Sequence, residues 1–389
     1  MKVVVFAHTP PPFHGQSYMV ELMLAGLKSR DRDGLQIFHV NASLSDRVEE
    51  IGKFKWKKLF LLMKYCVRAW RCHLFDGADT FYYIPAPGKR NAVYRDWLAM
   101  VFCRPIFKRI IFHWHAAGLG SWLEKEAKPW ERRITRRLLG RADLSIVLSE
   151  FGRADAMCLS PKRIEIVPNG IPDPCPDFEK RVLPDRQRRQ KERSRGELTS
   201  FIVLFAGTCS EAKGLFATLD AVALVNQQFT DRRLPISVSL VVAGEFLSNA
   251  ERNRFNQRIA RSDLNACEEQ SRCLVDYVGF VSGPKKDELF RRCDCLCFPS
   301  LYPAEGQPVT IIEALAFGLP VVATRWRGIP DLLAGSEARL IDDQDPKAIA
   351  NALKDLLNAE TWTMNRKLFL DNYSLDKYVD GLKCAFAKL

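Results

Sequence analysis

Short apolar runs alternate with longer segments of helical periodicity along the whole chain. The runs are rich in β-branched and aromatic residues and are bounded by Pro, Gly or polar clusters, which is typical of buried strands. Strands that alternate with helices indicate βαβ units and parallel sheets. Strands are predicted at 3–7, 36–40, 80–84, 109–112, 144–148, 164–167, 201–205, 237–243, 276–278, 295–298 and 321–323, with helices such as 215–228 and 284–292 between them.

The chain has 389 residues, which is too many for one hydrophobic core. We therefore predict an α/β fold of two doubly wound, Rossmann-like domains that face an interdomain cleft. Ligands of such sheets bind where the carboxyl ends of strands lead into helix N-termini. The predicted parts are an N-terminal domain at 1–178, a basic linker at 179–198, a C-terminal domain at 199–365 and C-terminal helices at 366–389, for which packing back on the first domain is one arrangement.

Composition indicates a globular protein, with 47% hydrophobic and 27% charged residues. No run reaches the roughly 18 apolar residues that a spanning helix needs, and the opening segment is too short for a signal peptide. We therefore expect a cytoplasmic protein, with peripheral attachment to the inner face of the cytoplasmic membrane as an option. The twelve Cys residues follow no framework spacing, so we expect reduced thiols.

The formal net charge of +12 is concentrated early in the chain, because residues 1–178 contain 28 Lys and Arg against 18 Asp and Glu. An anionic partner is indicated, namely nucleic acid, a membrane surface or a phosphorylated substrate. Residues 53–71 predict an amphipathic basic helix, which suits either a core-packed helix with a basic outer face or a helix on a membrane surface. The segment 179–198 is either a solvated connector or a contact for anionic lipid.

Three strand-to-helix loops carry polar groups that could contact a ligand. The loop Gly207–Gly214 is a near miss to the nucleotide P-loop, and its amides and Lys213 either meet a diphosphate or are an ordinary helix start. His14-Gly15-Gln16 follows the first strand, where Gly15 permits close approach of a ligand. His113 and His115 end another strand on one face. We discount a metal, because no third ligand has suitable spacing.

Alternate thiols at Cys293, Cys295 and Cys297 fit core packing better than metal binding. The densest motif lies at 299–324, where Glu305 stands in a loop before the helix that carries Glu313. Small and polar residues between them leave helix N–H groups open for phosphate oxygens, and each carboxylate can accept hydrogen bonds from sugar hydroxyls.

Together these motifs resemble those of retaining nucleotide-sugar glycosyltransferases of the GT-B fold, of the family 4 type that builds bacterial surface polysaccharides. The resemblance covers nearly the whole chain. It is carried by Glu305 and Glu313 with seven residues between them, and by the segments 318–322, 168–171, 277–280, 213–214 and 14–15.

The resemblance implies that the C-terminal domain binds the donor. Glu313 would hold the ribose and Glu305 the sugar. The catalytic residues implied are His115, Glu305 and Lys213, with His113 as second choice for His115. The donor-binding residues implied are Gly15, Gly207, Thr208, Lys213, Gly279, Phe280, Val281, Glu305, Gly306, Gln307, Pro308, Val309, Thr310 and Glu313, and His14, Gln16 and His113 would lie on the acceptor side.

The implied reaction is transfer of a sugar from a nucleoside diphosphate-sugar to an acceptor hydroxyl with retention, the expected acceptor being a lipid-linked saccharide. No metal or cofactor is expected, because the D-x-D pairs at Asp31 and Asp343 lie in loop or helix-cap contexts. Thr208 departs from the family, which often has Arg there, so one permanent cation is missing. The alternatives are a non-catalytic sugar-nucleotide or polysaccharide-binding module, an epimerase or phosphorylase of the same fold, and a nucleic-acid binder, for which no motif is present.

Overall fold

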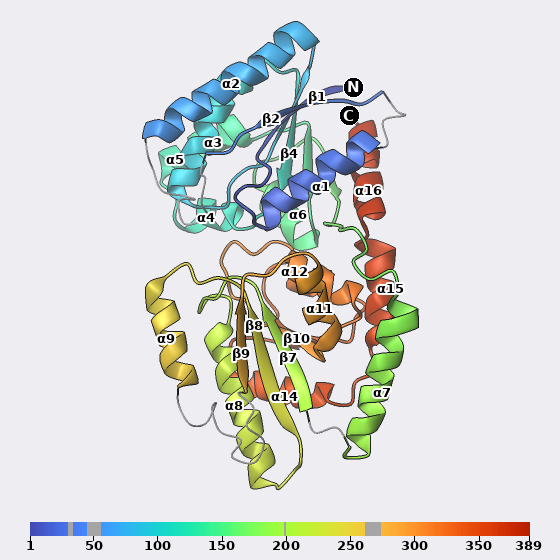
Figure 1. Ribbon diagram of the computed structural model, residues 1–389. Helices are drawn as coiled ribbons and strands as arrows, with labels where there is room; N and C mark the ends of the chain where they lie inside the picture. The colour runs from blue at the N-terminus through green and yellow to red at the C-terminus, as the bar shows by residue number, and fades with distance from the viewer. Residues whose placement is uncertain (30–33, 45–55, 198–199, 261–273) are drawn as a thin grey trace. The chain divides into compact units, whose positions relative to one another are not determined.

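The computed structural model describes residues 1–29, 34–44, 56–197, 200–260 and 274–389. Contacts divide the chain into two compact units, and each unit contains one six-stranded parallel sheet (Figure 1). The first unit comprises residues 1–172, 303–307 and 372–389, and the second comprises residues 173–302 and 308–371.

The sheet of the first unit has the strand order β2-β1-β3-β4-β5-β6. All six strands predicted for the first half are present. β1 has the sequence KVVVFA and buries every side chain after Lys2, as expected of a parallel strand that is covered on both faces. The strands are β1 (Lys2–Ala7), β2 (Gln36–Asn41), β3 (Thr80–Tyr83), β4 (Arg109–Trp114), β5 (Leu144–Val147) and β6 (Ile164–Ile166).

Helices cover both faces of this sheet (Figure 1). α1 and α16 pack closely, because a Cβ on Gly26 of α1 would collide with Val379 of α16. The C-terminal residues 372–389 therefore pack within the first unit. The helices are α1 (Gly15–Ser29), α2 (Trp56–Asp76), α3 (Arg90–Cys103), α4 (Leu119–Lys125), α5 (Pro129–Leu139), α6 (Glu150–Met157) and α16 (Leu375–Ala387).

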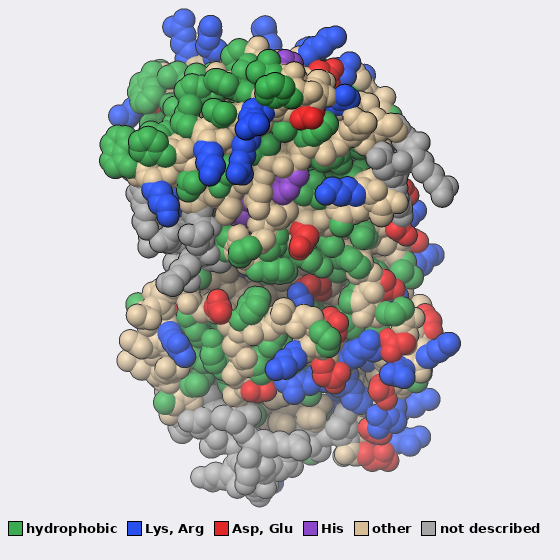
Figure 2. All heavy atoms as spheres, turned by 45° about the horizontal axis from the view of Figure 1, so that its top comes forward, with side chains coloured by type: hydrophobic (Ala, Val, Ile, Leu, Met, Phe, Trp, Pro, Cys, Tyr) green, Lys and Arg blue, Asp and Glu red, His purple; other side chains and the backbone are tan. Residues whose placement is uncertain are grey.

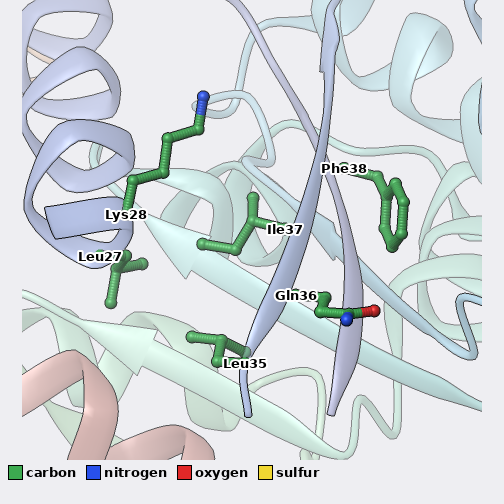
Figure 3. Close-up of a pocket in the computed structure, with 6 residues that line it drawn as sticks. All are labelled: Leu27, Lys28, Leu35, Gln36, Ile37 and Phe38. Carbon is green, nitrogen blue, oxygen red and sulfur yellow. The ribbon is translucent and has the colours of Figure 1, made fainter. Parts of the chain in front are cut away.

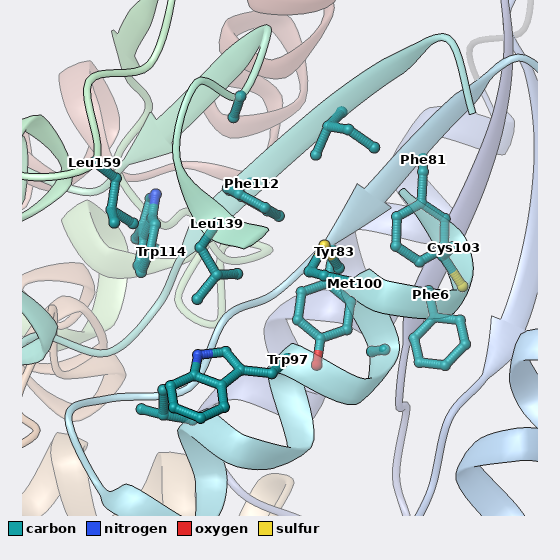
Figure 4. Close-up of a cluster of buried hydrophobic side chains, with 14 of the residues drawn as sticks. Phe6, Phe81, Tyr83, Trp97, Met100, Cys103, Phe112, Trp114, Leu139 and Leu159 are labelled. Atoms are coloured by element: carbon teal, nitrogen blue, oxygen red, sulfur yellow. The ribbon is translucent and has the colours of Figure 1, made fainter. Parts of the chain in front are cut away.

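The core of the first unit is rich in aromatic residues (Figure 4). Phe6, Phe81 and Phe112 come from three neighbouring strands and are almost fully buried. Trp97 and Met100 of α3 pack against them from the helical layer. Buried aromatic rings remove a large apolar area from water, so this layer fixes the strands whose carboxyl ends carry the polar residues described below.

The sheet of the second unit has the order β12-β11-β10-β7-β8-β9. If β7 is counted as the first strand, this order corresponds to the doubly wound strand order of dinucleotide-binding domains. β12 was not predicted from the sequence, because it has only three residues and two of them are half-buried. The strands are β7 (Ser200–Ala206), β8 (Ser237–Ala243), β9 (Val275–Gly279), β10 (Cys295–Phe298), β11 (Val321–Thr324) and β12 (Arg339–Ile341).

α8 and α14 pack together with this sheet, and Cys295 and Cys297 lie in the same core cluster, as core packing of the thiols predicts. The helices of the second unit are α8 (Leu215–Asp231), α9 (Asn249–Ile259), α11 (Pro284–Arg292), α12 (Val309–Ala316), α13 (Ile329–Leu332), α14 (Pro346–Leu356) and α15 (Trp362–Asn372), preceded by the π-helical segment Phe178–Val182 and α7 (Leu183–Ser194).

The basic segment that the sequence indicated as an exposed connector is largely helical. Arg186 and Arg193 of α7 are buried. The Arg186 guanidinium donates to the carbonyl of Phe290 at 2.9 Å, near the C-terminus of α11, where carbonyl groups lack helical partners. Arg193 approaches Asp294 to 3.2 Å. The solvated connector was therefore a wrong prediction for these two side chains, which hold α7 against the second unit.

A hollow lies at the amino end of β2, between that strand and the end of α1 (Figure 3). It is lined by Leu27, Lys28, Leu35, Gln36, Ile37 and Phe38. The strand-to-helix loops lie at the opposite edge of the same sheet, so this hollow contains none of the expected site residues. None of the described helices has the length and apolarity needed to cross a membrane.

Candidate functional site

The strand order of the second unit has a switch point between β7 and β10, which lie side by side while their following helices cover different faces. Two loops leave this point, residues 207–214 after β7 and 299–308 after β10. They touch each other, because the Leu301 amide donates to the carbonyl of Ala212 at 2.8 Å. The two longest ligand-binding motifs predicted from the sequence therefore meet at one place.

Glycines give the loop after β7 its path. Gly207 and Gly214 have φ angles of +149° and +83°, which L side chains rarely adopt. A Cβ on Gly214 would also collide with the carbonyl of Pro299 in the other loop. Gly214 is the N-cap of α8 and offers no side-chain acceptor to the first-turn amides. The Leu215 amide donates instead to the Ser210 carbonyl at 3.3 Å.

Lys213 precedes that helix and is half-buried. Its ammonium lies 5.2 Å from the ring centre of Phe298 and 5.0 Å from that of Tyr302. Aromatic faces attract a cation at these distances, so the ammonium is held beside the start of the loop 299–308. Thr208, in the same loop, is also half-buried.

α12 begins directly after the second loop. Its N-cap is Pro308, which offers no side-chain acceptor, and no described side chain caps the helix. The Ile311 amide donates to the Pro308 carbonyl at 3.1 Å. The amides of Val309 and Thr310 are available to an anion, and the helix dipole favours one there. Val309 and Thr310, which form this turn, are half-buried.

Glu313 lies one turn into α12 and is buried. Its carboxylate accepts a hydrogen bond of 2.5 Å from the ammonium of Lys286 on α11. Burial raises the pKa of the Glu313 carboxyl, and the Lys286 ammonium offsets part of that rise. Lys286 was not predicted from the sequence. Its position in the first turn of a helix could have pointed to a carboxylate partner, because a cation there is unfavourable with respect to the helix dipole.

The loop after β9 contains the other expected donor residues. Gly279 has a φ angle of +71°, and the side chain of Phe280 is 54% exposed. The Gly279 carbonyl accepts a hydrogen bond of 2.8 Å from the Gly244 amide at the end of β8. An exposed aromatic ring at the carboxyl end of a strand offers a face on which a planar base can stack.

In the first unit, His8 and His14 flank the proline turn after β1. Their Nε2 atoms lie 2.9 Å apart, and the Ser17 amide approaches His14 Nδ1 at 3.4 Å. Burial lowers the pKa of His14 to about 4, and the neighbouring His8 adds to the effect. The His14 ring is therefore neutral near pH 7, and burial lowers the pKa of His8 as well. His14 was predicted from the sequence but His8, which directly follows the buried strand, was not.

His113 and His115 lie at the end of β4, with ring centres 4.1 Å apart. His113 is fully buried and forms a hydrogen bond of 2.5 Å with the hydroxyl of Tyr82. Burial lowers the pKa of His115 to about 3, and His14 contributes. Within the described residues, Nε2 of His115 is buried without a hydrogen-bond partner. Such an atom favours a ligand that brings a partner.

The loop 303–307 packs with the first unit. Gly306 lies against His115, since a Cβ there would collide with the His115 carbonyl. This contact brings the buried Glu305 into the neighbourhood of the histidines. The Gln307 side chain accepts a hydrogen bond of 2.6 Å from the Asn169 amide, so its side chain has a structural role.

The remaining predicted residues are distributed as follows. Gly15 begins α1, and no described heavy atom beyond its neighbours lies within 4 Å of a Cβ built on it, so a ligand has room there. Gln16 is half-buried in the first turn of α1, and Val281 is half-buried after β9. Asp345 caps α14, as its helix-cap context predicts, whereas Asp31 lies outside the described residues.

The chain is similar in sequence to known glycosyltransferases. Residues 200–359 match the family model described as glycosyl transferases group 1. A D-inositol 3-phosphate glycosyltransferase of Corynebacterium urealyticum is 30% identical over 259 residues, which are 63% of this chain and 56% of that protein. The amylovoran biosynthesis glycosyltransferase AmsK of Erwinia amylovora is 28% identical over 163 residues, 41% of this chain and 36% of that protein. The first three relatives are matched over 56%, 34% and 49% of their own lengths.

Among solved structures, Anabaena HepE in complex with UDP and glucose matches with a TM-score of 0.65 at 16% identity, over 99% of each chain. The two-sheet fold is therefore that of GT-B glycosyltransferases, and the predicted α/β GT-B fold is confirmed. The predicted resemblance is confirmed as a similarity in sequence: residues 200–359, which contain the second sheet, match the group 1 glycosyl transferases.

Proposed function

We propose that the protein is a retaining glycosyltransferase that moves a sugar from a nucleoside diphosphate-sugar to an acceptor hydroxyl. A lipid-linked saccharide in surface polysaccharide assembly is the proposed acceptor. The observation that carries the donor class is the pair of loops at the switch point, which combines the Lys213 ammonium with the uncapped start of α12. A cation beside a helix N-terminus suits a diphosphate.

The diphosphate is the leaving group in this reaction, and its negative charge grows as the bond to the sugar breaks. Lys213 and the α12 amides would therefore stabilise the transition state more than the bound donor, which is the requirement for catalysis. The Glu313 carboxylate, whose ionised form is favoured by the Lys286 ammonium, would accept hydrogen bonds from the ribose hydroxyls.

The sugar would be held by Glu305 and by Nε2 of His115. A neutral imidazole forms a hydrogen bond with a hydroxyl group without adding charge. For retention we propose attack on the face that the diphosphate leaves. The bond from the anomeric carbon to the phosphate oxygen breaks, the acceptor oxygen bonds to that carbon, and the acceptor proton passes to the departing phosphate. No nucleophile from the protein takes part.

The relatives support the donor and the setting. The HepE structure holds UDP and glucose, and AmsK acts in amylovoran biosynthesis. The excess of Lys and Arg over Asp and Glu in residues 1–178 suits an anionic acceptor such as a lipid-linked diphosphate sugar.

The experiment begins with thermal shifts against uridine, guanosine and adenosine diphosphates and their sugars. Donor turnover is then followed by proton NMR, which identifies the anomer that is released or transferred. We expect one nucleotide class to raise the melting temperature, and the product to keep the donor's configuration. Glu305→Gln should abolish turnover, whereas Glu337→Gln, at an exposed site on the second unit, should not. An inverted product would contradict retention.

A non-catalytic sugar-nucleotide-binding module is the second candidate. Thr208 favours it, because at this position the phosphate loop lacks the Arg that would act beside Lys213 to ease departure of the diphosphate. Donor binding without turnover, over a panel of lipid-linked and free saccharide acceptors, would establish this alternative.

A further inference from the structure

The outer face of α2 is not the polar face that a surface helix normally presents. The helix packs inward through Leu62, Cys66 and Ala69, which are buried. Trp56, Phe60 and Leu74 have exposed fractions of 70%, 75% and 72%. The predicted core-packed helix with a basic outer face describes the inward side of α2, but large apolar side chains also point outward.

Four of the outward apolar side chains of α2 form one line. Trp56, Phe60, Val67 and Leu74 are separated by four, seven and seven residues, which at about 100° per residue places them within about 40° of one another around the helix. We call these four residues the apolar stripe. It runs for about 27 Å along the helix.

A row of basic residues accompanies the apolar stripe. Lys57, Lys64, Arg68 and Arg71 are all exposed, and their positions lie roughly 60–120° from Trp56 around the helix. We call these four residues the basic row. The only acidic residue of α2 is Asp76, its last. The outer face is therefore cationic along its whole length.

α3 extends the apolar area on the other side. The Trp70 indole donates to the Phe102 carbonyl at 2.9 Å, so α3 flanks the stripe on the side away from the basic row. Leu98 and Val101 of α3 are 39% and 49% exposed. Figure 2 shows hydrophobic side chains gathered beside Lys and Arg side chains on the end of the molecule that carries α2.

We propose that this face docks the protein on an anionic phospholipid bilayer. The apolar stripe would enter the boundary between headgroups and acyl chains, and the basic row would contact the lipid phosphates, as in interfacial amphipathic helices. The positive charge of the basic row favours an anionic bilayer over an uncharged apolar partner. The aliphatic Val67 and Leu74 give no surface for stacking bases, so a nucleic acid fits less well. The inference extends the proposed lipid-linked acceptor, but the binding itself requires no donor.

The test is co-sedimentation of the full chain with vesicles of phosphatidylcholine, with and without phosphatidylglycerol. We expect binding to the anionic vesicles that weakens as salt rises, and little binding to the zwitterionic ones. Changing the basic row to Gln should lower the partition coefficient about a hundredfold or more. Phe60→Ser combined with Leu74→Ser should lower it about tenfold or more. Changing Arg232, Arg233, Arg252 and Lys347 to Gln, four exposed basic residues of the second unit, is the matched control and should leave it unchanged.

Two further measurements locate the contact. Brominated lipids should quench tryptophan fluorescence in the wild type and less in Trp56→Phe, and thermal melts verify that every variant folds. Absence of binding to anionic vesicles would overturn the proposal, as would binding that the stripe variants do not alter. Equal competition by DNA would assign the face to nucleic acid. Donor turnover on a soluble acceptor is measured separately. Turnover without lipid binding would contradict this inference but would not contradict the proposed function.

Discussion

The polar residues at the carboxyl edges of the two sheets differ in charge. At the edge of the second sheet, Lys213 lies beside two aromatic rings and Lys286 is paired with Glu313. At the edge of the first sheet, the pKa values of His14 and His115 are lowered to about 4 and about 3. Near neutral pH, permanent charges therefore lie on one edge and uncharged imidazoles on the other.

This difference in charge indicates which part of a substrate each sheet edge would bind. A fixed cation beside open helix amides suits a group that is itself charged. Neutral rings with an unpartnered buried nitrogen suit hydroxyl groups, which need directional hydrogen bonds and gain little from charge. On the proposed function, the second edge takes the diphosphate and the first takes the sugar.

The largest effect should come from removing the cation at the second edge. In Lys213→Met the aromatic contacts keep an apolar partner while the charge is lost. We expect kcat/KM for the donor to fall roughly 10²- to 10³-fold, because the ammonium acts where charge develops. Steady-state kinetics with the donor found by thermal shift measures this.

Lys285→Met is the matched control, since Lys285 is exposed on the second unit. It changes the net charge by the same amount and should leave kcat/KM within about twofold, because an exposed charge is screened by salt. Equal losses in both variants would mean that net charge, and not the position of Lys213, decides donor turnover.

At the first edge, His115→Ala should lower kcat about a hundredfold, because a positioned hydrogen bond to the sugar is lost. The pH dependence of the rate tests whether the His115 ring is neutral. Since the pKa of His115 is lowered to about 3, the ring stays uncharged as the pH falls from 8 to 5. The wild-type pH–rate profile should therefore show no limb from His115 in this range. An acid limb that vanishes in His115→Asn would contradict the neutral-ring assignment.

The fold was predictable because its signals are local and strong. β1 and β10 are continuous apolar runs, and such runs between polar turns have few other folded arrangements. β12 was missed since three residues, two of them half-buried, leave no periodicity to detect. The helical state of residues 183–194 was missed because its burial depends on arginines that bond to carbonyls distant in the sequence.

The candidate site was predictable where one motif supplies several groups, as with Glu305 and Glu313. It was not predictable where two elements meet through a pair of side chains. The contact between Lys286 and Glu313 joins residues 27 positions apart, and that between His8 and His14 depends on the path of the proline turn. Spacing along the chain carries no information on such pairs until the fold brings them together.

A smaller effect should follow from Lys286→Met. Burial and the nearby Asp287 carboxylate then act on Glu313 without an opposing cation, so the pKa of its carboxyl rises further and the protonated form gains as the pH falls. A protonated carboxyl accepts fewer hydrogen bonds from ribose hydroxyls. We expect the donor KM to rise about tenfold at low pH, which is roughly the worth of one hydrogen bond to a charged group, and to approach the wild-type value at high pH. A rise in KM that is the same at every pH would show that Lys286 supports only the packing of α11.

The smallest change should come from restoring a cation at the phosphate loop. Thr208 is half-buried directly after Gly207, in the loop that leads to Lys213. A guanidinium at this position could bond to two phosphate oxygens at once. We expect Thr208→Arg to raise kcat/KM for the donor about three- to tenfold, and Thr208→Gln, which adds length without charge, to raise it less than twofold. Thr208→Arg could instead slow turnover while donor binding tightens. That result would mean that the wild-type loop leaves room for a cation supplied from the acceptor side. The absence of Arg at position 208 would then be an adaptation to that acceptor.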